Sequence, residues 1–152
     1  MTMLKHSDTE DASYIELAEF IATYGQQEHI AADLKELFTR IVFNVAVANR
    51  DDHLRNHGFM RSPAGWRLAP AFDMNPSFKK NEHALSLNFF DRLPDLEVVI
   101  STAEYYRLDT GHAREIVAMV CEIVSKWEIS AKKLGLTARN RAEAEHLFIC
   151  EP

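Results

Sequence analysis

Apolar residues recur at helical spacing in the first part of the chain. Between Leu17 and Tyr24 they repeat every three or four positions, and Ser13 and Glu16 in front of them form a capping box. A longer stripe from about Ile30 to Ala48 is amphipathic at first and then apolar on nearly every face. We therefore expect a short helix followed by a central buried helix, which delivers the next loop from a rigid element.

The middle of the chain is rich in turn-forming residues. Residues 49–56 break the central helix, and residues 57–68 predict a short β-hairpin around a Pro/Gly turn. Prolines keep the next stretch irregular, apart from an expected strand at 84–89. Helical spacing returns in three later segments, which are 96–106, 116–134 (closed by Gly135) and 137–148. These patterns predict a mainly α protein of the α+β class.

Length and composition are those of one globular domain. The 152 residues are 47% hydrophobic and 26% charged, enough for a single core. We expect one domain over residues 1–152, with residues 1–12 flexible. The net charge of −6 argues against a general nucleic-acid or anionic-membrane binder, because such proteins need a basic face.

Two cysteines are too few for a disulfide framework. Cys121 lies in an apolar helical pattern, so we expect a reduced, buried thiol there. The chain opens with no signal peptide, and its longest apolar run, Ile41 to Ala48, is far too short for a membrane span. A cytoplasmic location is the expectation.

The segment after the central helix has the residue types and spacing of a phosphoryl-transfer site. Protein kinases carry a catalytic loop, H-R-D-x-x-x-x-N, whose aspartate acts on the substrate hydroxyl and whose asparagine binds Mg²⁺. Asp51 and Asn56 have this spacing, and Arg50 supplies the arginine. Asp73 follows the expected hairpin, where kinases have the second magnesium-binding aspartate. The hard oxygen ligands at positions 51, 56 and 73 suit Mg²⁺, and by the kinase motif Asn56 and Asp73 are the expected metal ligands.

Two plainer interpretations compete with this one. Asp51 and Asn56 taken alone are compatible with ordinary solvated turn residues, although Asp73 and the hairpin weaken that explanation. His53 and His57 are four residues apart, as in some zinc sites on helices. No third soft ligand accompanies the two histidines, and the residues around them do not continue a helix.

Around this segment the sequence resembles one known family. Phe43-Asn44 is followed by Asn49-x-Asp51-x-His53-x-x-Asn56, and then by Gly65-Trp66-Arg67-Leu68-Ala69-Pro70-Ala71-Phe72-Asp73. The pattern is similar to the C-terminal domain of HipA-type serine/threonine kinases, over most of the chain from Ser13 to about Leu134. The resemblance implies a protein-kinase-like helical C-lobe with a small β-hairpin after the catalytic loop.

The resemblance also implies roles for single residues. Asp51 matches the catalytic base of the family, and Asn56 and Asp73 match its ligands for Mg²⁺, through which ATP is held. His53 stands two residues after the base, where conventional kinases usually have a lysine near the transferred phosphate, and is expected to orient the loop or a phosphate. Both the spacing and the family pattern select Asp51 over the neighbouring carboxylate of Asp52.

By the same resemblance, the partners are proteins. HipA kinases are often the toxin of a bacterial toxin–antitoxin pair, their known targets include aminoacyl-tRNA synthetases, and a DNA-binding antitoxin restrains them. We therefore expect a protein substrate and a DNA-binding antitoxin, with no direct nucleic-acid contact and no membrane association.

No segment of the sequence matches an ATP-binding N-lobe. The five glycines are isolated, with no G-x-G among them, and no lysine stands in a strand ahead of the catalytic loop. We expect the N-lobe to be absent, and ATP binding to need one from another chain or from a homo-oligomer. The apolar residues beside the loop, Phe59, Phe72 and Phe78, are then expected to be less buried than their type suggests.

The sequence is compatible with three functions from different classes. The first is a kinase catalytic lobe that works when joined to an N-lobe. The second is a catalytically silent, pseudokinase-like binding module. The third is a metal-dependent phosphohydrolase whose site would be built from Asp51, Asp52, His53 and Asp73.

Overall fold

The described part of the chain is mainly helical with one small hairpin, as the sequence predicted. The computed structural model describes residues 12–77 and 79–150, so the lead-in expected to be flexible lies almost entirely outside these ranges. No helix within them is long and apolar enough to cross a membrane. The elements are α1 (Tyr14–Tyr24), η1 (Gln27–His29), α2 (Ile30–Ala46), η2 (Leu54–Asn56), β1 (Phe59–Ser62), β2 (Gly65–Leu68), α3 (Leu96–Ser101), η3 (Ala103–Tyr106), α4 (Thr110–Val124), α5 (Trp127–Lys133) and α6 (Ala138–Glu145).

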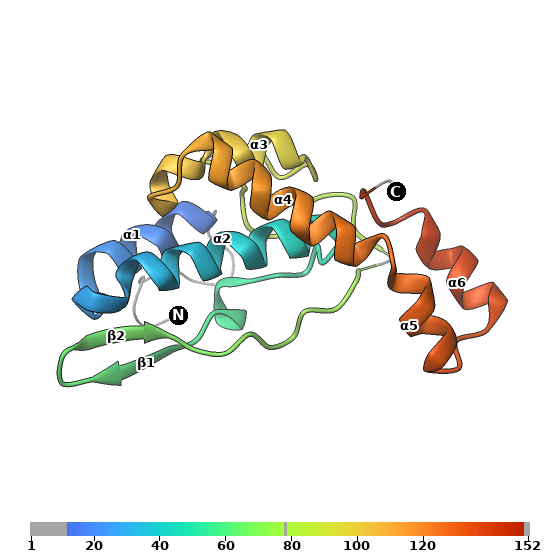
Figure 1. The fold of residues 1–152 in the computed structure, drawn as a ribbon, viewed down its shortest axis with the longest axis horizontal. Helices are drawn as coiled ribbons and strands as arrows, with labels where there is room; N and C mark the ends of the chain where they lie inside the picture. Colours follow the sequence, from blue (N-terminus) through green and yellow to red (C-terminus); the bar gives the residue numbers. More distant parts are fainter. Residues whose placement is uncertain (1–11, 78, 151–152) are drawn as a thin grey trace.

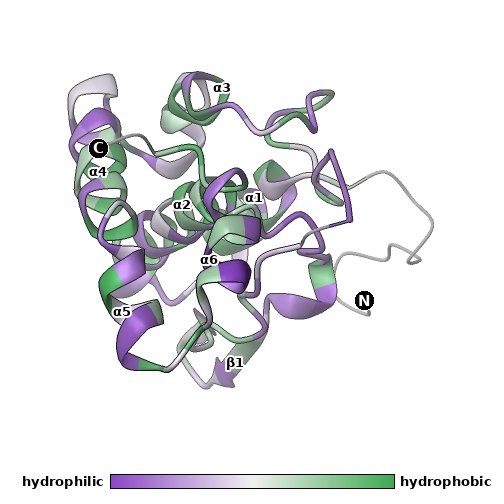
Figure 2. Cartoon of the chain, turned by 90° about the vertical axis from the view of Figure 1, so that its right-hand side faces the viewer, coloured by the Kyte–Doolittle hydropathy of each residue, from purple (hydrophilic) through white to green (hydrophobic). Residues whose placement is uncertain are grey.

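Helix α2 is the centre of the fold, and α1, α3, α4 and the hairpin all contact it (Figure 1). Its second half is buried on almost every face, as the apolar pattern predicted. Figure 2 shows the hydrophobic positions gathered in α1 and α2, whereas α5 and α6 are largely hydrophilic. The predicted capping interaction also forms at the start of α1, where the Glu16 carboxylate accepts a hydrogen bond from the Ser13 backbone N–H at 2.9 Å.

The hairpin is anchored to α2 by one buried carboxylate. Asp33 accepts hydrogen bonds from Arg67 Nε and Nη2 at 2.9 and 3.0 Å and from the Leu68 backbone N–H at 3.0 Å. The turn needs Gly65, whose φ of 136° suits glycine alone and whose backbone passes so close to Gln26 that a Cβ would lie 2.8 Å from its nitrogen. The hairpin direction, and therefore the position of the chain that follows it, is fixed from two sides.

The prediction of a strand at 84–89 is wrong. Within the described residues this segment makes only an isolated bridge, in which Tyr14 N–H donates to Ser86 C=O at 3.1 Å. The chain turns back immediately afterwards, because the Asn88 side-chain oxygen accepts from the backbone N–H groups of Phe90 and Asp91, both at 2.7 Å. An asparagine that bonds its own following backbone favours a turn over a ladder.

The prediction of a single helix at 116–134 is also wrong, because two helices, α4 and α5, occupy this segment. Helix α4 begins earlier, at Thr110, where Asp109 caps the helix by accepting from His112 N–H at 2.8 Å. It ends at Val124, where the Ser125 hydroxyl donates back to the Glu122 carbonyl at 3.0 Å. Serine competes with the helical backbone in this way, and α5 then runs in a new direction (Figure 1). The expected stop at Gly135, with φ 79°, is confirmed.

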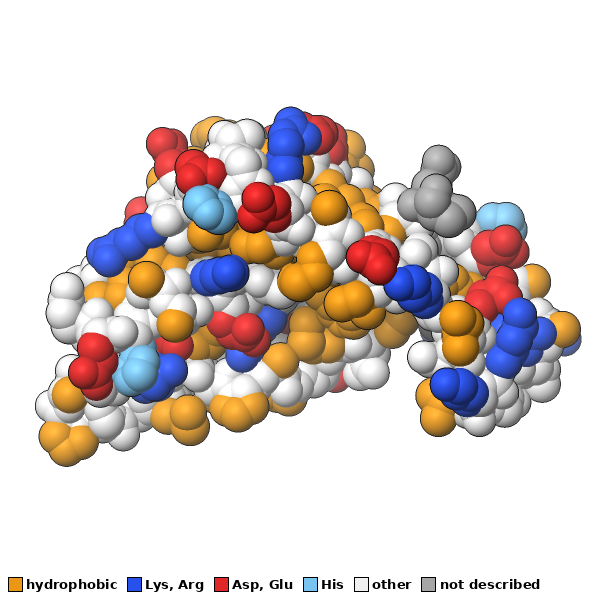
Figure 3. All heavy atoms as spheres, viewed as in Figure 1, with side chains coloured by type: hydrophobic (Ala, Val, Ile, Leu, Met, Phe, Trp, Pro, Cys, Tyr) orange, Lys and Arg blue, Asp and Glu red, His pale blue; other side chains and the backbone are white. Residues whose placement is uncertain are grey.

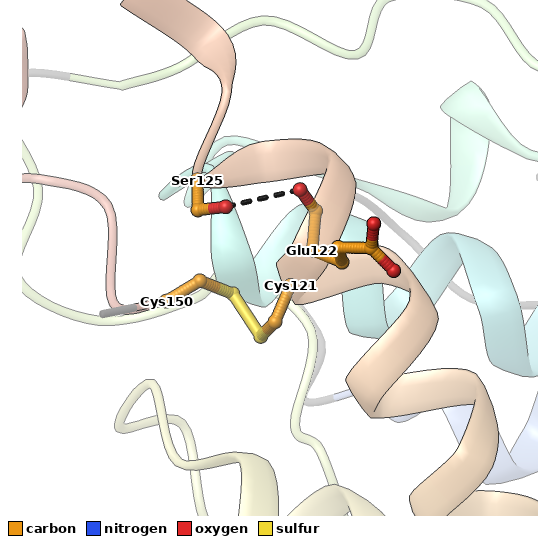
Figure 4. Close-up of a disulfide and its surroundings, with 4 residues drawn as sticks. All are labelled: Cys121, Glu122, Ser125 and Cys150. Atoms are coloured by element: carbon orange, nitrogen blue, oxygen red, sulfur yellow. Dashed lines mark hydrogen bonds between the residues drawn. A yellow bond between two sulfur atoms is a disulfide. The ribbon is translucent and has the colours of Figure 1, made fainter. Parts of the chain in front are cut away.

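The expectation of a reduced Cys121 is contradicted, since Cys121 and Cys150 form a disulfide (Figure 4). After α5 the chain folds back through α6, whose expected cap is confirmed because Thr137 Oγ1 accepts from Asn140 N–H at 3.2 Å. This return brings the Cα atoms of the two cysteines to 5.0 Å, although 29 positions separate them in the sequence. We call residues 127–150 the C-terminal arm.

The disulfide and the Ile149 N–H bond to Ala46 C=O at 3.2 Å attach the C-terminal arm to the rest of the fold, whereas the packing of Trp127 on Phe148 lies within the arm. A Cys121→Ser/Cys150→Ser variant should therefore lose about 3–4 kcal/mol in the free energy of detaching the arm, because a crosslink over 29 positions restricts the unfolded chain. Hydrogen exchange should show α5 and α6 exchanging faster while α1, α2 and α4 stay protected. Unchanged protection of the arm would show that packing alone holds it.

Candidate functional site

The loop after α2 leaves the helix through a left-handed residue. Ala48 has φ 57°, a conformation that costs a non-glycine residue about 1–2 kcal/mol. Its carbonyl accepts from the backbone N–H groups of Arg50 and Ser77, at 2.9 and 2.8 Å. The next residue, Asn49, is buried and donates through Nδ2 to Asn44 Oδ1 on α2 at 3.1 Å. The start of the loop is thus fixed by bonds to α2 and to a later segment.

Asp52 is buried, and one of its carboxylate oxygens is bonded to three other side chains of the fold. Its Oδ2 atom accepts from the Tyr14 hydroxyl at 2.7 Å, from Asn44 Nδ2 at 2.7 Å and from His57 Nε2 at 2.9 Å. Burial, and then the Asp52 charge, raises the pKa of Tyr14 well above its usual value, so this hydroxyl stays a donor. Asp52 therefore ties α1, α2 and the residues at both ends of the loop together, and its side chain is almost closed to solvent.

Asp51, the adjacent residue, has the opposite environment. Its side chain is 57% exposed. Its Oδ1 atom accepts from His53 Nε2 at 3.0 Å and from the Lys80 ammonium group. The hydrogen bond from Lys80, with a smaller contribution from His53, holds the pKa of Asp51 below its usual value. Asp51 is an ionised, accessible carboxylate, which is what a group acting on a substrate hydroxyl requires.

The two expected metal ligands lie in the same neighbourhood. Asn56 is buried at the end of η2 and lines a cavity of about 10 Å³, which Phe72 and Met74, the neighbours of Asp73, also line. Asp73 is left-handed, with φ 57°, and its carbonyl lies 3.5 Å from Asn49 Nδ2. Because the hairpin returns the chain to the loop, the two neighbours of Asp73 line the same cavity as Asn56, whereas the Asp73 carboxylate itself accepts from Asn75 Nδ2 at 3.1 Å.

The donor set of Asn56 and Asp73 fits Mg²⁺. An amide oxygen and a carboxylate are hard ligands, and Mg²⁺ typically takes only one or two carboxylates from the protein, with the rest from phosphates and water. Within residues 12–77 and 79–150, no three His, Cys, Asp or Glu residues group as a metal site. The cluster that a phosphohydrolase would need is not assembled there. His53 and His57 bond different aspartates, so a shared zinc site is not formed either.

A segment that the sequence did not single out covers one side of the loop. Residues 77 and 79–84 are bound to it at three points, through Ser77 N–H to Ala48 C=O, Arg50 Nη1 to Lys80 C=O at 2.5 Å, and Ala84 N–H to Arg50 C=O at 3.1 Å. Arg50, which the spacing identified only as part of an Arg-Asp pair, therefore positions this segment. No sequence signal marks Lys80, because its contact with Asp51 spans 29 positions.

His83 is buried beneath the same loop, with 1% of its surface exposed. Desolvation, and then the nearby Arg50 charge, lowers its pKa to about 4, so the ring is neutral at physiological pH. Because protonation of this buried ring is unfavourable, we expect the stability of the fold around the loop to fall at acid pH.

Apolar residues flank the site on the surface. Phe72 is 49% exposed and Phe59 is half-buried, as expected, whereas Phe78 lies outside the described ranges. A second, apolar cavity of about 300 Å³ lies between α2, α4 and the segment before Asn75, lined by Phe43, Ala71, Met74, Met119, Val120 and Ile123 among others. Hydrophobic side chains gather on this face between α4 and the C-terminal arm (Figure 3).

Comparison with known proteins gives two findings. The family model of the HipA-like C-terminal domain matches residues 1–127, which leaves most of the C-terminal arm outside the match. The chain is also similar to HipA of Shewanella oneidensis MR-1, solved in a complex of the toxin–antitoxin proteins HipA and HipB with their operator DNA. The TM-score is 0.71 at 15% sequence identity, a likeness of fold, and the match covers 91% of this chain and 34% of that one. The chain thus spans about a third of that protein's length, and no curated protein matches it.

Asp52→Ala should destabilise the protein by roughly 3–5 kcal/mol. The change leaves three buried donors, on Tyr14, Asn44 and His57, without an acceptor, and each unsatisfied group costs about 1–3 kcal/mol. Urea denaturation measures the loss. Asp51→Ala is the matched control and should cost less than about 1 kcal/mol, because its ion pair is exposed. Equal losses in the two variants would contradict the assignment of Asp52 as the anchor.

Stability should fall as the pH is lowered from about 7 toward 4. The folded-state pKa of His83 is depressed to about 4, below the usual 6.5, so the unfolded chain takes up a proton that the folded chain does not. Between pH 7.5 and 5 this one residue should cost about 2 kcal/mol of unfolding free energy. Urea melts at both pH values measure it. In a His83→Gln variant the pH-dependent loss should shrink by that amount, and an unchanged slope would refute the role of His83.

Proposed function

Since this chain belongs to the family of HipA-like C-terminal domains, we propose that it is the C-terminal catalytic lobe of a serine/threonine protein kinase. In this proposal, Asp51 acts on the substrate hydroxyl, Asn56 and Asp73 hold Mg²⁺, and ATP is the phosphoryl donor. His53 supports the base. The lobe works together with an ATP-binding N-lobe.

The observation that carries the proposal is the contrast between the two adjacent aspartates. A kinase base must be ionised and open to substrate, and Asp51 is both, with donors on one oxygen only. Asp52 is buried and bonded through one oxygen to three side chains of the fold, which suits a scaffold residue. Burial therefore selects the same carboxylate as the kinase spacing, through an independent physical criterion.

The remaining parts have separable tasks. When bound, Mg²⁺ would neutralise charge on the nucleotide phosphates. Asn56 and Asp73 would supply its protein oxygens from one neighbourhood beside the loop. Asp51 would orient the substrate hydroxyl and take its proton as the new oxygen–phosphorus bond forms. His53 Nε2, 3.0 Å from Asp51 Oδ1, would keep the carboxylate ionised and aimed until then.

A second lobe is part of the proposal because the chain spans only about a third of the HipA chain that it resembles. The exposed Phe72 and the apolar cavity beside Met74 support a partner surface next to the site, since soluble proteins rarely leave such patches uncovered. We propose that this surface faces the N-lobe, supplied in the same polypeptide, by another chain or within an oligomer.

Proteins are the partners in this proposal. The substrate is a protein hydroxyl, and an aminoacyl-tRNA synthetase is the target class that the family resemblance suggests. The HipB component of the Shewanella complex supports a DNA-binding antitoxin as a second partner. DNA would then be contacted by the antitoxin, which agrees with the net charge of −6 on this chain.

The test separates the roles of the two carboxylates when the lobe is joined to an ATP-binding N-lobe. Asp51→Asn should lower phosphoryl transfer by roughly 10²–10⁴-fold with nucleotide affinity nearly unchanged, because it removes the base only. Asp73→Asn should weaken the Mg²⁺-dependent nucleotide affinity itself. Radiolabelled ATP turnover and calorimetry measure the two effects. Equal loss of nucleotide binding in both variants would contradict the role assignment.

A further inference from the structure

Lys80 lies on the proposed base, although neither its position in the sequence nor its neighbours suggested it. Its ammonium group donates to Asp51 Oδ1, the same oxygen that receives His53 Nε2. The Lys80 side chain is 44% exposed, so the ammonium is open to solvent on its other sides. An ammonium has three N–H donors, and within residues 12–77 and 79–150 Asp51 takes one of them.

The placement of Lys80 is built by the fold. Its carbonyl accepts from the Arg50 guanidinium, and the segment on either side is bound to the loop by Ser77 N–H and Ala84 N–H. These three attachments span 77–84 and all lead to residues 48–50, immediately before Asp51. A lysine on a free surface segment has no such support. The backbone that carries Lys80 is therefore positioned by the same loop that carries the base.

The chemistry beside Asp51 defines what this ammonium meets. In phosphoryl transfer the substrate hydroxyl that contacts the base bonds to phosphorus, so the phosphoryl oxygens must come within a few ångströms of the base. Negative charge on these oxygens is stabilised by fixed cations. An ammonium held on the base oxygen, with donors to spare, lies within reach of the incoming phosphoryl group.

We propose that Lys80 is a further catalytic residue, whose ammonium group binds the phosphoryl group while it passes from ATP to the substrate hydroxyl at Asp51. The bond from phosphorus to the bridging oxygen of ADP breaks, the bond to the hydroxyl oxygen forms, and the hydroxyl proton goes to Asp51. Lys80 exchanges no proton and contributes N–H···O contacts. The inference rests on the proposed function. Neither of the two residues after Asp51, Asp52 and His53, provides a fixed positive charge for the phosphoryl group, and Lys80 supplies one.

The test uses the chain itself and a probe that needs no nucleotide-binding lobe. Inorganic tripolyphosphate with Mg²⁺ is titrated at constant ionic strength, and the affinity is read from NMR chemical-shift changes. Wild type, Lys80→Ala and Lys79→Ala are compared, since Lys79 is an exposed neighbour of the same charge. Lys80→Ala should weaken binding by about tenfold, as expected for one charge-assisted contact, while Lys79→Ala should stay within about twofold of wild type. A thermal melt checks that each variant is folded.

Each outcome decides the question. Equal affinities for Lys80→Ala and Lys79→Ala overturn the proposal, and tighter binding by Lys80→Ala overturns it in favour of a lysine that blocks the site. Asp73→Asn separates the proposal from the function on which it rests. If wild-type binding depends on Mg²⁺ and is lost in Asp73→Asn, the metal site stands whatever Lys80 does. If wild type shows no Mg²⁺-dependent binding, the metal site and the role of Lys80 fail together.

Discussion

The Asp52 carboxylate is the point at which α1, α2 and the loop that carries Asp51 and Asn56 are joined. One of its oxygens accepts from Tyr14, Asn44 and His57 in a space closed to water. In a low-dielectric interior such bonds are strong, and an unpaired charge there is costly, so the loop has one low-energy position. Asp51 is the preceding residue of the same fixed loop, and its side chain is 57% exposed.

Two further polar contacts extend this order to the rest of the site. Asp33 on α2 fixes the hairpin through Arg67, and the hairpin returns the chain so that Asp73 lies beside Asn49. Arg50 then holds the segment that bears Lys80. The central helix thus positions the loop with Asp51 and Asn56, the segment with Asp73 and the cation of Lys80 through hydrogen bonds, several of them buried. Preorganisation of this kind is what phosphoryl transfer asks of a protein.

Local signals in the sequence predicted most of the fold. Periodicity identified α1 and α2, the turn residues identified the hairpin, and Thr137 and Gly135 marked helix ends. The family relationship was visible in the motif from Phe43 to Asp73 and is confirmed by the family model. Spacing also singled out Asp51, Asn56 and Asp73, whose chemical roles stay predictions.

The features that the sequence did not predict depend on contacts between distant residues. The Cys121–Cys150 bond, the Lys80–Asp51 pair and the Tyr14–Asp52 bond join positions 29 to 38 apart. The break between α4 and α5 and the turn at Asn88 are local, but each rests on a side chain that competes with the backbone, which hydrophobic periodicity does not register. The pattern of apolar residues indicates which side chains are buried, whereas hydrogen bonds between buried polar groups determine where the loops lie.

The central claim is that Asn56 and Asp73 hold the metal while Asp51 stays free to act on the substrate. Crystals of the lobe joined to an ATP-binding N-lobe, grown with Mn²⁺ and a non-hydrolysable ATP analogue, would test it directly through the anomalous scattering of the metal. The account predicts an anomalous peak at the side-chain oxygens of Asn56 and Asp73, with Asp51 outside the coordination sphere. A peak coordinated by Asp51 or Asp52, with Asn56 and Asp73 unligated, would contradict it.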